Sequence, residues 1–280
     1  LTTDKGVITK GDPTLRFRYG GGAYATTYTY SGEALRNPVE KELRLKNVTT
    51  GVKIISYEDL HFTWFKGTVG SGTELDSAPV DAGEYYVVVS VDEAANYHAA
   101  SCSSEQITIQ PKTVQNPEII LSQDSYKYDG TEKTPTVTVK DEDKIIPSTE
   151  YTVSYSDNKN AGTATVTISS KSGGNYVVSG SKDFTITKVD SAELTTEELT
   201  VSGVYGTKTG KLAITGGKVT TTDGKEIAGT WTVTDTASHD MEKLLTVEET
   251  EICTLTFTPE DNNYPQLTAE VTPTIKKRPA

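Results

Sequence analysis

The chain has 280 residues, of which 34% are hydrophobic, and its formal net charge is −12. Lys and Arg cluster only at 276–278, so we expect no nucleic-acid partner, because such partners need many cations to neutralise phosphates. No run approaches the roughly 20 apolar residues of a membrane-spanning helix, so we expect no membrane insertion by this segment. The abrupt ends, LTTDKG and TIKKRPA, lead us to expect a monomeric segment of a longer chain.

The first part of the chain alternates apolar and polar residues in short runs that predict β-strands. Tyr28 and Tyr30 lie two apart in YTYSG, which places both rings on one face of a strand before a turn. HFTWFKG follows and contains Trp64. The segment DAGEYYVVVSVDEAANY (81–97) then leads to a closing strand, ITIQ, at 107–110. Short strands separated by Gly, Asp and Asn indicate an all-β fold.

The middle part repeats this order in a shorter form. YKYDG at 126–130 matches YTYSG, and its Asp-Gly step is a strong signal for a tight turn. EYTVSYS supplies the next strand, in which Tyr155 matches Trp64. AGTATVTISSKSGGNY (161–176) then matches the segment of the first part that also begins with Ala-Gly and ends with Asn-Tyr.

The last part is a more diverged copy. GVYG, which contains Tyr205, takes the place of the tyrosine turn, and GTWTVTD matches the next strand with Trp231 and Val233 on one face. The Asn-Tyr pair recurs at 263–264. The run at 237–247 permits one helical turn.

The spacing of these pairs indicates a repeated structural unit. Gly83 and Gly162 each lie thirteen residues before the Asn of the pair, which is Asn96 in one copy and Asn175 in the next. We expect the two glycines to occupy equivalent turns, and the three Asn-Tyr pairs to occupy equivalent positions. We also expect one buried strand position to be shared by Trp64, Tyr155 and Val233.

The copies predict three consecutive domains, at 1–112, 113–189 and 190–280, each a small β-sandwich of immunoglobulin-like type. A β-grasp-like sheet with one short helix is the alternative fold. The closing strands run almost directly into the next copy, and such short linkers favour stacked units over loosely tethered ones. Cys102 and Cys253 fall at non-equivalent places and predict neither a disulfide framework nor a metal site.

The run DAGEYYV resembles the start of strand F in immunoglobulin domains, where a tyrosine turns its hydroxyl back onto the backbone. Tyr85 would be that tyrosine, Val87 takes the place of the disulfide cysteine, and Trp64 would be the core tryptophan. The middle copy has Ala164 where Tyr85 lies, and Trp64 is too close to Val87 in sequence for the antibody strand order. The resemblance therefore implies a sandwich with an immunoglobulin-like corner and not the antibody topology.

Taken together, the copies resemble the tandem all-β modules of bacterial cell-surface proteins, which include bacterial Ig-like modules and the YDG and MBG repeat domains. The resemblance is carried by YKYDG, NKNAGTATVTI, GGNY and FTITK in the middle copy, by DAGEYYVVVSVDEAANY in the first and by LTFTPEDNNYPQL in the third. It implies an extracellular protein, secreted or surface-anchored, in which this segment is a non-catalytic stalk. The alternative is an adhesin module that binds a host glycoprotein or polysaccharide.

Catalytic motifs are absent from the sequence, and we expect neither enzyme activity nor a cofactor. The three histidines, His61, His98 and His239, share no motif. Acidic runs such as DED at 141–143 could hold Ca²⁺ through oxygen ligands, but none matches an EF-hand loop, and we expect solvated turns.

One stretch, RYGGGAYATTYTYSG, has a local excess of aromatic residues that a two-sided strand would not bury completely. Amphipathic rings offer contact area at low entropic cost. This stretch is therefore the candidate recognition surface, and its residues are Tyr19, Tyr24, Tyr28 and Tyr30.

Overall fold

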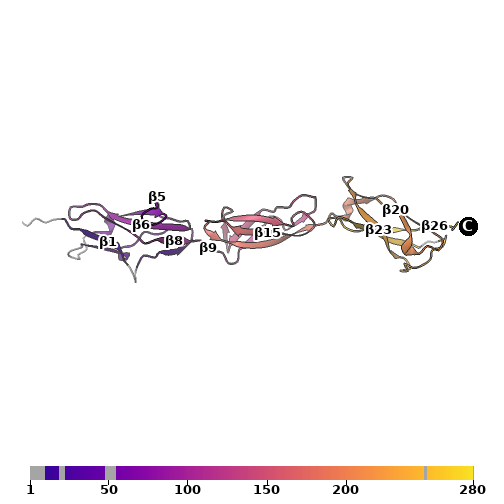
Figure 1. Cartoon of the computed structure of the whole chain (residues 1–280), viewed down its shortest axis with the longest axis horizontal. Coiled ribbons are helices and arrows are strands. Elements are labelled where there is room, and N and C mark those ends of the chain that lie inside the picture. The colour runs from indigo at the N-terminus through magenta and orange to yellow at the C-terminus, as the bar shows by residue number, and fades with distance from the viewer. Residues whose placement is uncertain (1–9, 19–22, 48–54, 249–250, 280) are drawn as a thin grey trace, which may run out of the picture. The chain divides into compact units, whose positions relative to one another are not determined.

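The computed structural model describes residues 10–18, 23–47, 55–248 and 251–279 (Figure 1). Within these residues the helices are four 3-10 turns: η1 (Glu40–Glu42), η2 (Tyr57–Asp59), η3 (Ser191–Glu193) and η4 (Thr209–Lys211). All other regular structure there is β-strand, so the all-β prediction is confirmed. The run 237–247 forms turns and irregular chain instead of the helical turn that its sequence permits. No described helix has the length and apolar content needed to cross a bilayer.

The chain divides into two compact units, each of which contains part of the middle copy. The first unit consists of residues 1–119, 138–153 and 168–180, and the second of residues 120–137, 154–167 and 181–280. The first unit therefore joins the first copy to three segments of the middle copy, which lie near its start, in its interior and just before its last strand. The second unit joins the rest of the middle copy to the third.

The first copy contains eight strands among its described residues: β1 (Pro13–Phe17), β2 (Thr27–Thr29), β3 (Leu43–Asn47), β4 (Leu60–Lys66), β5 (Thr73–Leu75), β6 (Gly83–Val91), β7 (Ala100–Ser103) and β8 (Ile107–Gln110). The larger sheet has the order β2-β8-β6-β4-β5, with β7 also paired to β6, and β1 and β3 form a separate antiparallel pair. Alternation along these strands sends one set of side chains inward. Buried residues of both sheets, such as Leu45, Val87 and Ile107, share a single core.

The predicted immunoglobulin-like corner is present at the start of β6. The Tyr85 hydroxyl donates a hydrogen bond to the Asp81 carbonyl at 2.9 Å, and the side chain is buried. Gly83 has a φ of +154°, and a Cβ there would stand 3.2 Å from the Tyr85 hydroxyl. Gly162 begins β15 with a φ of +147°. The two glycines therefore occupy equivalent positions, each opening a nine-residue strand with a backbone that L residues rarely adopt.

The middle copy contributes nine strands: β9 (Lys112–Thr113), β10 (Glu118–Leu121), β11 (Ser125–Lys127), β12 (Val137–Asp141), β13 (Lys144–Ile146), β14 (Tyr151–Ser156), β15 (Gly162–Ser170), β16 (Tyr176–Val177) and β17 (Ser179–Thr187). Their sheets have the orders β10-β12-β13, β11-β17-β15-β14 and β16-β9.

The third copy also contains nine strands in its described part: β18 (Leu194–Thr196), β19 (Leu199–Val204), β20 (Ala213–Gly216), β21 (Val219–Thr221), β22 (Glu226–Ile227), β23 (Gly229–Thr236), β24 (Cys253–Pro259), β25 (Leu267–Val271) and β26 (Thr274–Lys276). Three small sheets result, with the orders β18-β21-β22, β20-β19-β26 and β23-β24-β25. The whole described chain is thus built from several small sheets.

One parallel strand pair recurs in all three copies. An early strand pairs in parallel with the closing strand: β2 with β8, β11 with β17, and β19 with β26. The tyrosine after the early strand then donates its backbone N–H to the last carbonyl of the closing strand. These bonds are Tyr30 to Gln110 at 2.8 Å, Tyr128 to Thr187 at 2.9 Å and Tyr205 to Lys276 at 2.9 Å. Tyr205 is therefore the third member of the series.

The expectation of one shared buried aromatic position is met in part. Trp64 is 3% exposed, and its indole N–H donates to Asn37 Oδ1 at 2.9 Å. Tyr155 is only half-buried and donates its hydroxyl to the Pro135 carbonyl at 2.7 Å. Val233 is half-buried as well. In the third copy the indole of Trp231, two residues earlier, donates to the Gly217 carbonyl at 2.7 Å.

Candidate functional site: two Asn-Tyr joints

The three Asn-Tyr pairs lie at the same place in their copies, beside the segment that leads into the first strands of the copy. The Asn carbonyl accepts a backbone N–H there each time: from Gly11 to Asn96 at 2.9 Å, from Lys112 to Asn175 at 2.9 Å and from Val189 to Asn263 at 3.0 Å. The prediction that the pairs occupy equivalent positions is confirmed. The tyrosines Tyr97, Tyr176 and Tyr264 are all buried.

In the first unit the side chain of Asn175 links the middle copy to the first. Its Oδ1 accepts the backbone N–H of Ala82 at 2.7 Å, and its Nδ2 donates to Asp81 Oδ1 at 3.0 Å. Glu150 Oε2 accepts the backbone N–H of Asn175 at 2.6 Å and so holds the loop in place. One amide therefore satisfies a donor and an acceptor of the Asp81-Ala82-Gly83 loop. We call this contact the first joint.

In the second unit Asn263 makes the same contact between the third copy and the middle one. Its Oδ1 accepts the backbone N–H of Ala161 at 2.6 Å, and its Nδ2 donates to Asn160 Oδ1 at 3.2 Å. Asp261 Oδ1 accepts the backbone N–H of Asn263 at 2.9 Å. The Asn263 side chain is 7% exposed, so its polar atoms are satisfied by this loop and not by solvent. We call this contact the second joint.

A tyrosine pair accompanies each joint. Tyr30 meets Tyr176 edge-on in the first joint, with ring centroids 5.3 Å apart and planes at 73°. Tyr128 meets Tyr264 edge-on in the second joint, at 6.1 Å and 77°. Edge-to-face geometry sets the positive rim of one ring against the negative face of the other. The second tyrosine of Tyr-x-Tyr-x-Gly thus packs against the tyrosine of the next copy's Asn-Tyr pair.

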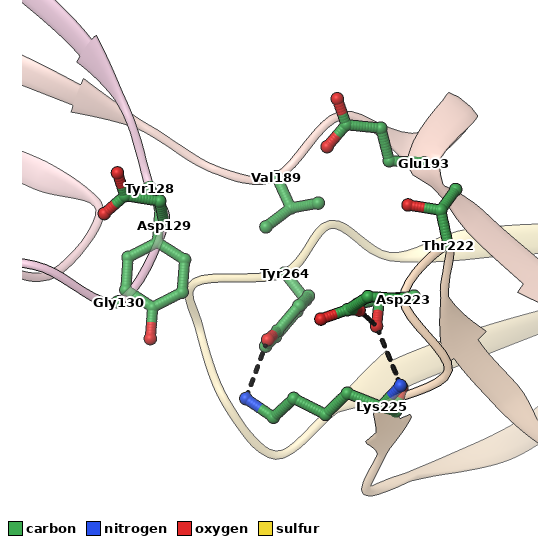
Figure 2. A pocket seen from close by; sticks show the side chains of 10 residues that line it. Tyr128, Asp129, Gly130, Val189, Glu193, Thr222, Asp223, Lys225 and Tyr264 are labelled. Atoms are coloured by element: carbon green, nitrogen blue, oxygen red, sulfur yellow. Dashed lines mark hydrogen bonds between the residues drawn. The ribbon is translucent and has the colours of Figure 1, made fainter.

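A lysine from a hairpin lies at each joint, but the two behave differently. In the first joint Lys144 Nζ lies 3.3 Å from where a Cβ at Gly32 would stand. In the second joint Lys225 Nζ donates to the Tyr264 hydroxyl at 3.1 Å and lies 5.5 Å from the centre of its ring (Figure 2). Hydrogen bonding to Tyr264, and the proximity of that hydroxyl, raise the pKa of Lys225.

The second joint opens into a cleft of about 320 Å³. Figure 2 shows Tyr128, Asp129 and Gly130 on one side, the hairpin with Asp223 and Lys225 on the other, and Tyr264 between them. Glu193 lies at the rim and forms an ion pair with Lys127. The ion pair from Lys133, together with hydrogen bonds from Thr131, holds the pKa of Asp129 well below its usual range. The cleft therefore combines two phenol rings with three carboxylates and one ammonium.

Such a lining suits noncovalent contact with a polar, hydroxyl- or amine-bearing group. Carboxylates accept hydrogen bonds, and aromatic faces pack against the apolar side of a sugar ring. Within the described residues, no group of three His, Cys, Asp or Glu is placed to hold a metal ion. His61 lies 3.3 Å from Asp92, and His239 Nδ1 lies 2.9 Å from Asp235. Both pairs are exposed, and none of their residues lines the cleft.

The three described tyrosines of the candidate recognition surface have different surroundings in the structure. Tyr24 is 6% exposed, which makes it a core residue and not a surface one, and its hydroxyl donates to the Arg36 carbonyl at 2.6 Å. Tyr28 is half-buried against Tyr24, and Tyr30 is half-buried in the first joint. Tyr19 lies outside the described residues.

The burial of Tyr24 involves an ion pair that sequence reasoning did not predict. Arg36 forms a bidentate bridge to the buried Glu42, with nitrogen–oxygen distances of 2.9 and 2.6 Å, and its guanidinium lies over the Tyr24 ring. The hydrogen bond from Arg36 lowers the pKa of Glu42 and keeps the carboxylate charged.

Sequence reasoning found the Asn-Tyr and Ala-Gly pairs as markers of a repeat, but it missed their joint role. The signal was available in the residue before each Ala-Gly, which is Asp81 in one copy and Asn160 in the other. Both side chains carry an oxygen that can accept a hydrogen bond from an amide. Lys225 had no comparable signal, because its role depends on which residues the hairpin faces.

Comparison with known proteins gives a likeness of structure only. No family model and no curated protein matches the chain. It is similar to the protocadherin gammaB7 EC3-6 cis-dimer structure, at 14% identity and TM-score 0.26, over 92% of this chain and 72% of that one. It is similar to mouse cadherin-23 EC22-24 at 11% identity and TM-score 0.26, over 96% of this chain and 99% of that one. A third similarity is to immunoglobulin domains 1–4 of Sidekick-1, at 11% identity and TM-score 0.26, over 94% of this chain and 76% of that one.

By their names, the three are cadherin or immunoglobulin domain structures. The strands of this chain are themselves arranged in several small sheets.

Proposed function

We propose that this chain is a non-catalytic structural segment of a secreted or surface-anchored bacterial protein. In it, three small immunoglobulin-like β-sandwich domains, at 1–112, 113–189 and 190–280, act in series as a stalk. The observation that carries the proposal is the pair of joints. At both places where one copy meets the next, an Asn side chain accepts an Ala N–H and two tyrosine rings meet edge-on. Domains on loose tethers have no need of such a contact.

Opening a joint would break its hydrogen bond and its ring contact. The Ala N–H would exchange its Asn partner for water, which costs about 0.5–1.5 kcal/mol. The tyrosine pair would add about 0.5–1.5 kcal/mol. Each term is modest, but a repeated contact of this kind biases every junction towards one orientation. The bacterial and extracellular parts of the proposal are supported by the motif resemblance described above.

Small-angle scattering tests the stalk. A compact globule of 280 residues has a radius of gyration of about 19 Å. Three domains of about 12 Å each, spaced by the roughly 30 Å that a nine-residue strand covers, give about 27 Å. We expect a value above about 25 Å, and the compact value would reject the proposal. A variant with Asn175→Ala and Asn263→Ala is the matched control, and we expect its scattering profile to broaden because the joints loosen.

A second candidate function, an adhesin that binds a host glycoprotein or polysaccharide, is favoured by the cleft of the second joint. Two phenol rings and three carboxylates meet there in one concave surface. A glycan and matrix-protein array with the purified chain tests it. Saturable binding that Tyr128→Ser abolishes, and that Tyr30→Ser at the first joint leaves intact, would assign adhesion to the cleft. Binding unchanged by Tyr128→Ser would remove the cleft from consideration.

A further inference from the structure

The Asn-Tyr pair of the first copy has the backbone of a joint but no loop docked on its side chain. The Asn96 carbonyl accepts the Gly11 N–H at 2.9 Å, and Gly11 pairs in parallel with Tyr97, as Lys112 pairs with Tyr176 in the first joint. The Asn96 side chain is nevertheless exposed and has no hydrogen-bond partner within the described chain. Asn175 and Asn263, at the same position, each hold an Ala N–H.

A carboxylate lies beside the Asn96-Tyr97 pair as one does at the first joint, but here it bonds the tyrosine hydroxyl instead of the Asn backbone N–H. Asp59 immediately precedes β4, as Glu150 immediately precedes β14, and it accepts the Tyr97 hydroxyl at 3.3 Å. Tyr97 is 7% exposed and belongs to the core of the first copy. The backbone and the buried tyrosine of a joint are therefore present, and no residue of the described ranges bonds the Asn96 side chain.

We propose that the Asn96 end of the first copy is an open joint that binds the Asx-Ala-Gly loop of a further repeat of the first- or middle-copy type. The inference rests on the proposed function, since it treats the Asn-Tyr pairs as joints. In the bound state Asn96 Oδ1 accepts the Ala N–H of the incoming loop, and Asn96 Nδ2 donates to the Asp or Asn that precedes the Ala. The incoming Tyr-x-Tyr-x-Gly tyrosine packs against this end of the first copy.

A second copy of this same chain cannot supply that loop. The N–H groups of Ala82 and Ala161 already donate within their own joints. In the third copy, the loop between β23 and β24 covers 237–252, contains no glycine and is held by Glu251. Glu251 accepts from the backbone N–H of Ser238 at 2.8 Å. The third copy does present Tyr205, which is 53% exposed, but without the Asx-Ala-Gly loop beside it.

A fusion tests the proposal. Residues 1–111 are placed directly before residues 11–280, which sets an extra Asp-Ala-Gly loop ahead of Asn96 with the spacing of the first joint. Exchange of the Asn side-chain amide protons is then followed by NMR in the native chain and in the fusion. In the native chain we expect slow exchange at Asn175 and Asn263 and fast exchange at Asn96. In the fusion we expect exchange at Asn96 to slow at least tenfold, together with protection of the added Ala N–H.

The outcomes are separable. Fast exchange at Asn96 in the fusion, with Asn175 and Asn263 still slow, overturns the open joint and leaves the stalk standing. Fast exchange at all three positions overturns the proposed function itself. An Asn96→Ala change in the fusion should abolish protection of the added Ala N–H. If the added first copy does not fold, residues 112–188 placed before residues 11–280 present Asn160-Ala161-Gly162 instead and carry the same test.

Discussion

The two joints share one geometry, and they differ in the charge around the asparagine. In the first joint the Asn175 amide lies between the carboxylates of Asp81 and Glu150. In the second joint the Asn263 side chain faces the neutral amide of Asn160, and the carboxylate of Asp261 bonds only its backbone N–H. The tyrosine rings are also closer in the first joint, at 5.3 Å against 6.1 Å. The backbone pattern therefore does not require a particular charge, and substitutions that add charge should tell the joints apart.

The largest difference is expected from the glycines that open β6 and β15. Gly83→Ala forces a positive φ on alanine and drives its Cβ towards the Tyr85 hydroxyl, whereas Gly162 has open space around it. Backbone strain of about 1–3 kcal/mol applies to both, and loss of the Tyr85 hydrogen bond adds about 1 kcal/mol at Gly83. Urea unfolding measures both losses of stability. It is followed by Trp64 fluorescence for the first copy and by near-ultraviolet circular dichroism for the middle copy. Equal losses would show that the corner contributes nothing at Gly83.

The next largest difference is expected from Asn175→Asp and Asn263→Asp, which keep the acceptor for the Ala N–H. Asn175→Asp sets a carboxylate against Asp81 and removes a donor, so we expect the first joint to lose about 2 kcal/mol. Hydrogen exchange at the Ala82 amide should then be about thirtyfold faster, since each 1.4 kcal/mol is tenfold.

Asn263→Asp is the matched comparison for that change. The Asn160 amide can turn to donate to the new carboxylate, so the loss at Ala161 should stay below about 1 kcal/mol. If the two aspartates accelerate exchange at Ala82 and Ala161 equally, the charge difference between the joints has no energetic consequence.

A smaller effect is expected from the tyrosine pairs. Tyr30→Leu and Tyr128→Leu remove the edge-to-face contact but keep an apolar side chain, so the cost should be about 1 kcal/mol at the first joint and less at the second. The exchange rates of the Asn175 and Asn263 side-chain protons measure this cost at each joint. Burial, and after it the proximity of Tyr176, raises the pKa of Tyr30. The Tyr30→Leu variant should therefore lose a late step in an alkaline absorbance titration.

The last comparison concerns the loop that replaces Asx-Ala-Gly in the third copy, where the effect depends on pH. Burial alone would raise the pKa of Glu251, but the Lys243 ion pair and hydrogen bonds from Ser238 bring it to about 2, below the ordinary 4.5. A depressed pKa in the folded state stabilises above the ordinary value, and that stability is lost as the pH falls from about 4.5 to 2.

Acid unfolding followed by Trp231 fluorescence measures this loss. We expect Glu251→Gln to remove the acid-dependent part in the third copy while leaving the Trp64 transition of the first copy unchanged. An acid dependence that survives Glu251→Gln would assign it to other carboxylates.

Local sequence rules predicted much of the fold. Alternation at period two predicted the strands, and Asp-x-Gly-x-Tyr predicted the Tyr85 corner, because both depend on residues a few positions apart. The glycines were also predictable, since only glycine readily takes the positive φ at these strand starts. The candidate recognition surface was harder to predict, because an aromatic stretch can be buried by partners elsewhere, as Arg36 and Glu42 bury Tyr24.

What the sequence by itself determined is the all-β character, the repeated order of motifs and the equivalence of the Asn-Tyr pairs. Tertiary structure alone decided that Asn175 contacts Ala82, 93 residues away, and that Asn263 contacts Ala161, 102 residues away. It also decided that Lys225 contacts Tyr264 and that a cleft lies beside the second joint. The reason is physical. Strand alternation is set by neighbouring residues along the backbone, whereas a side-chain hydrogen bond forms only between atoms that folding brings within about 3 Å.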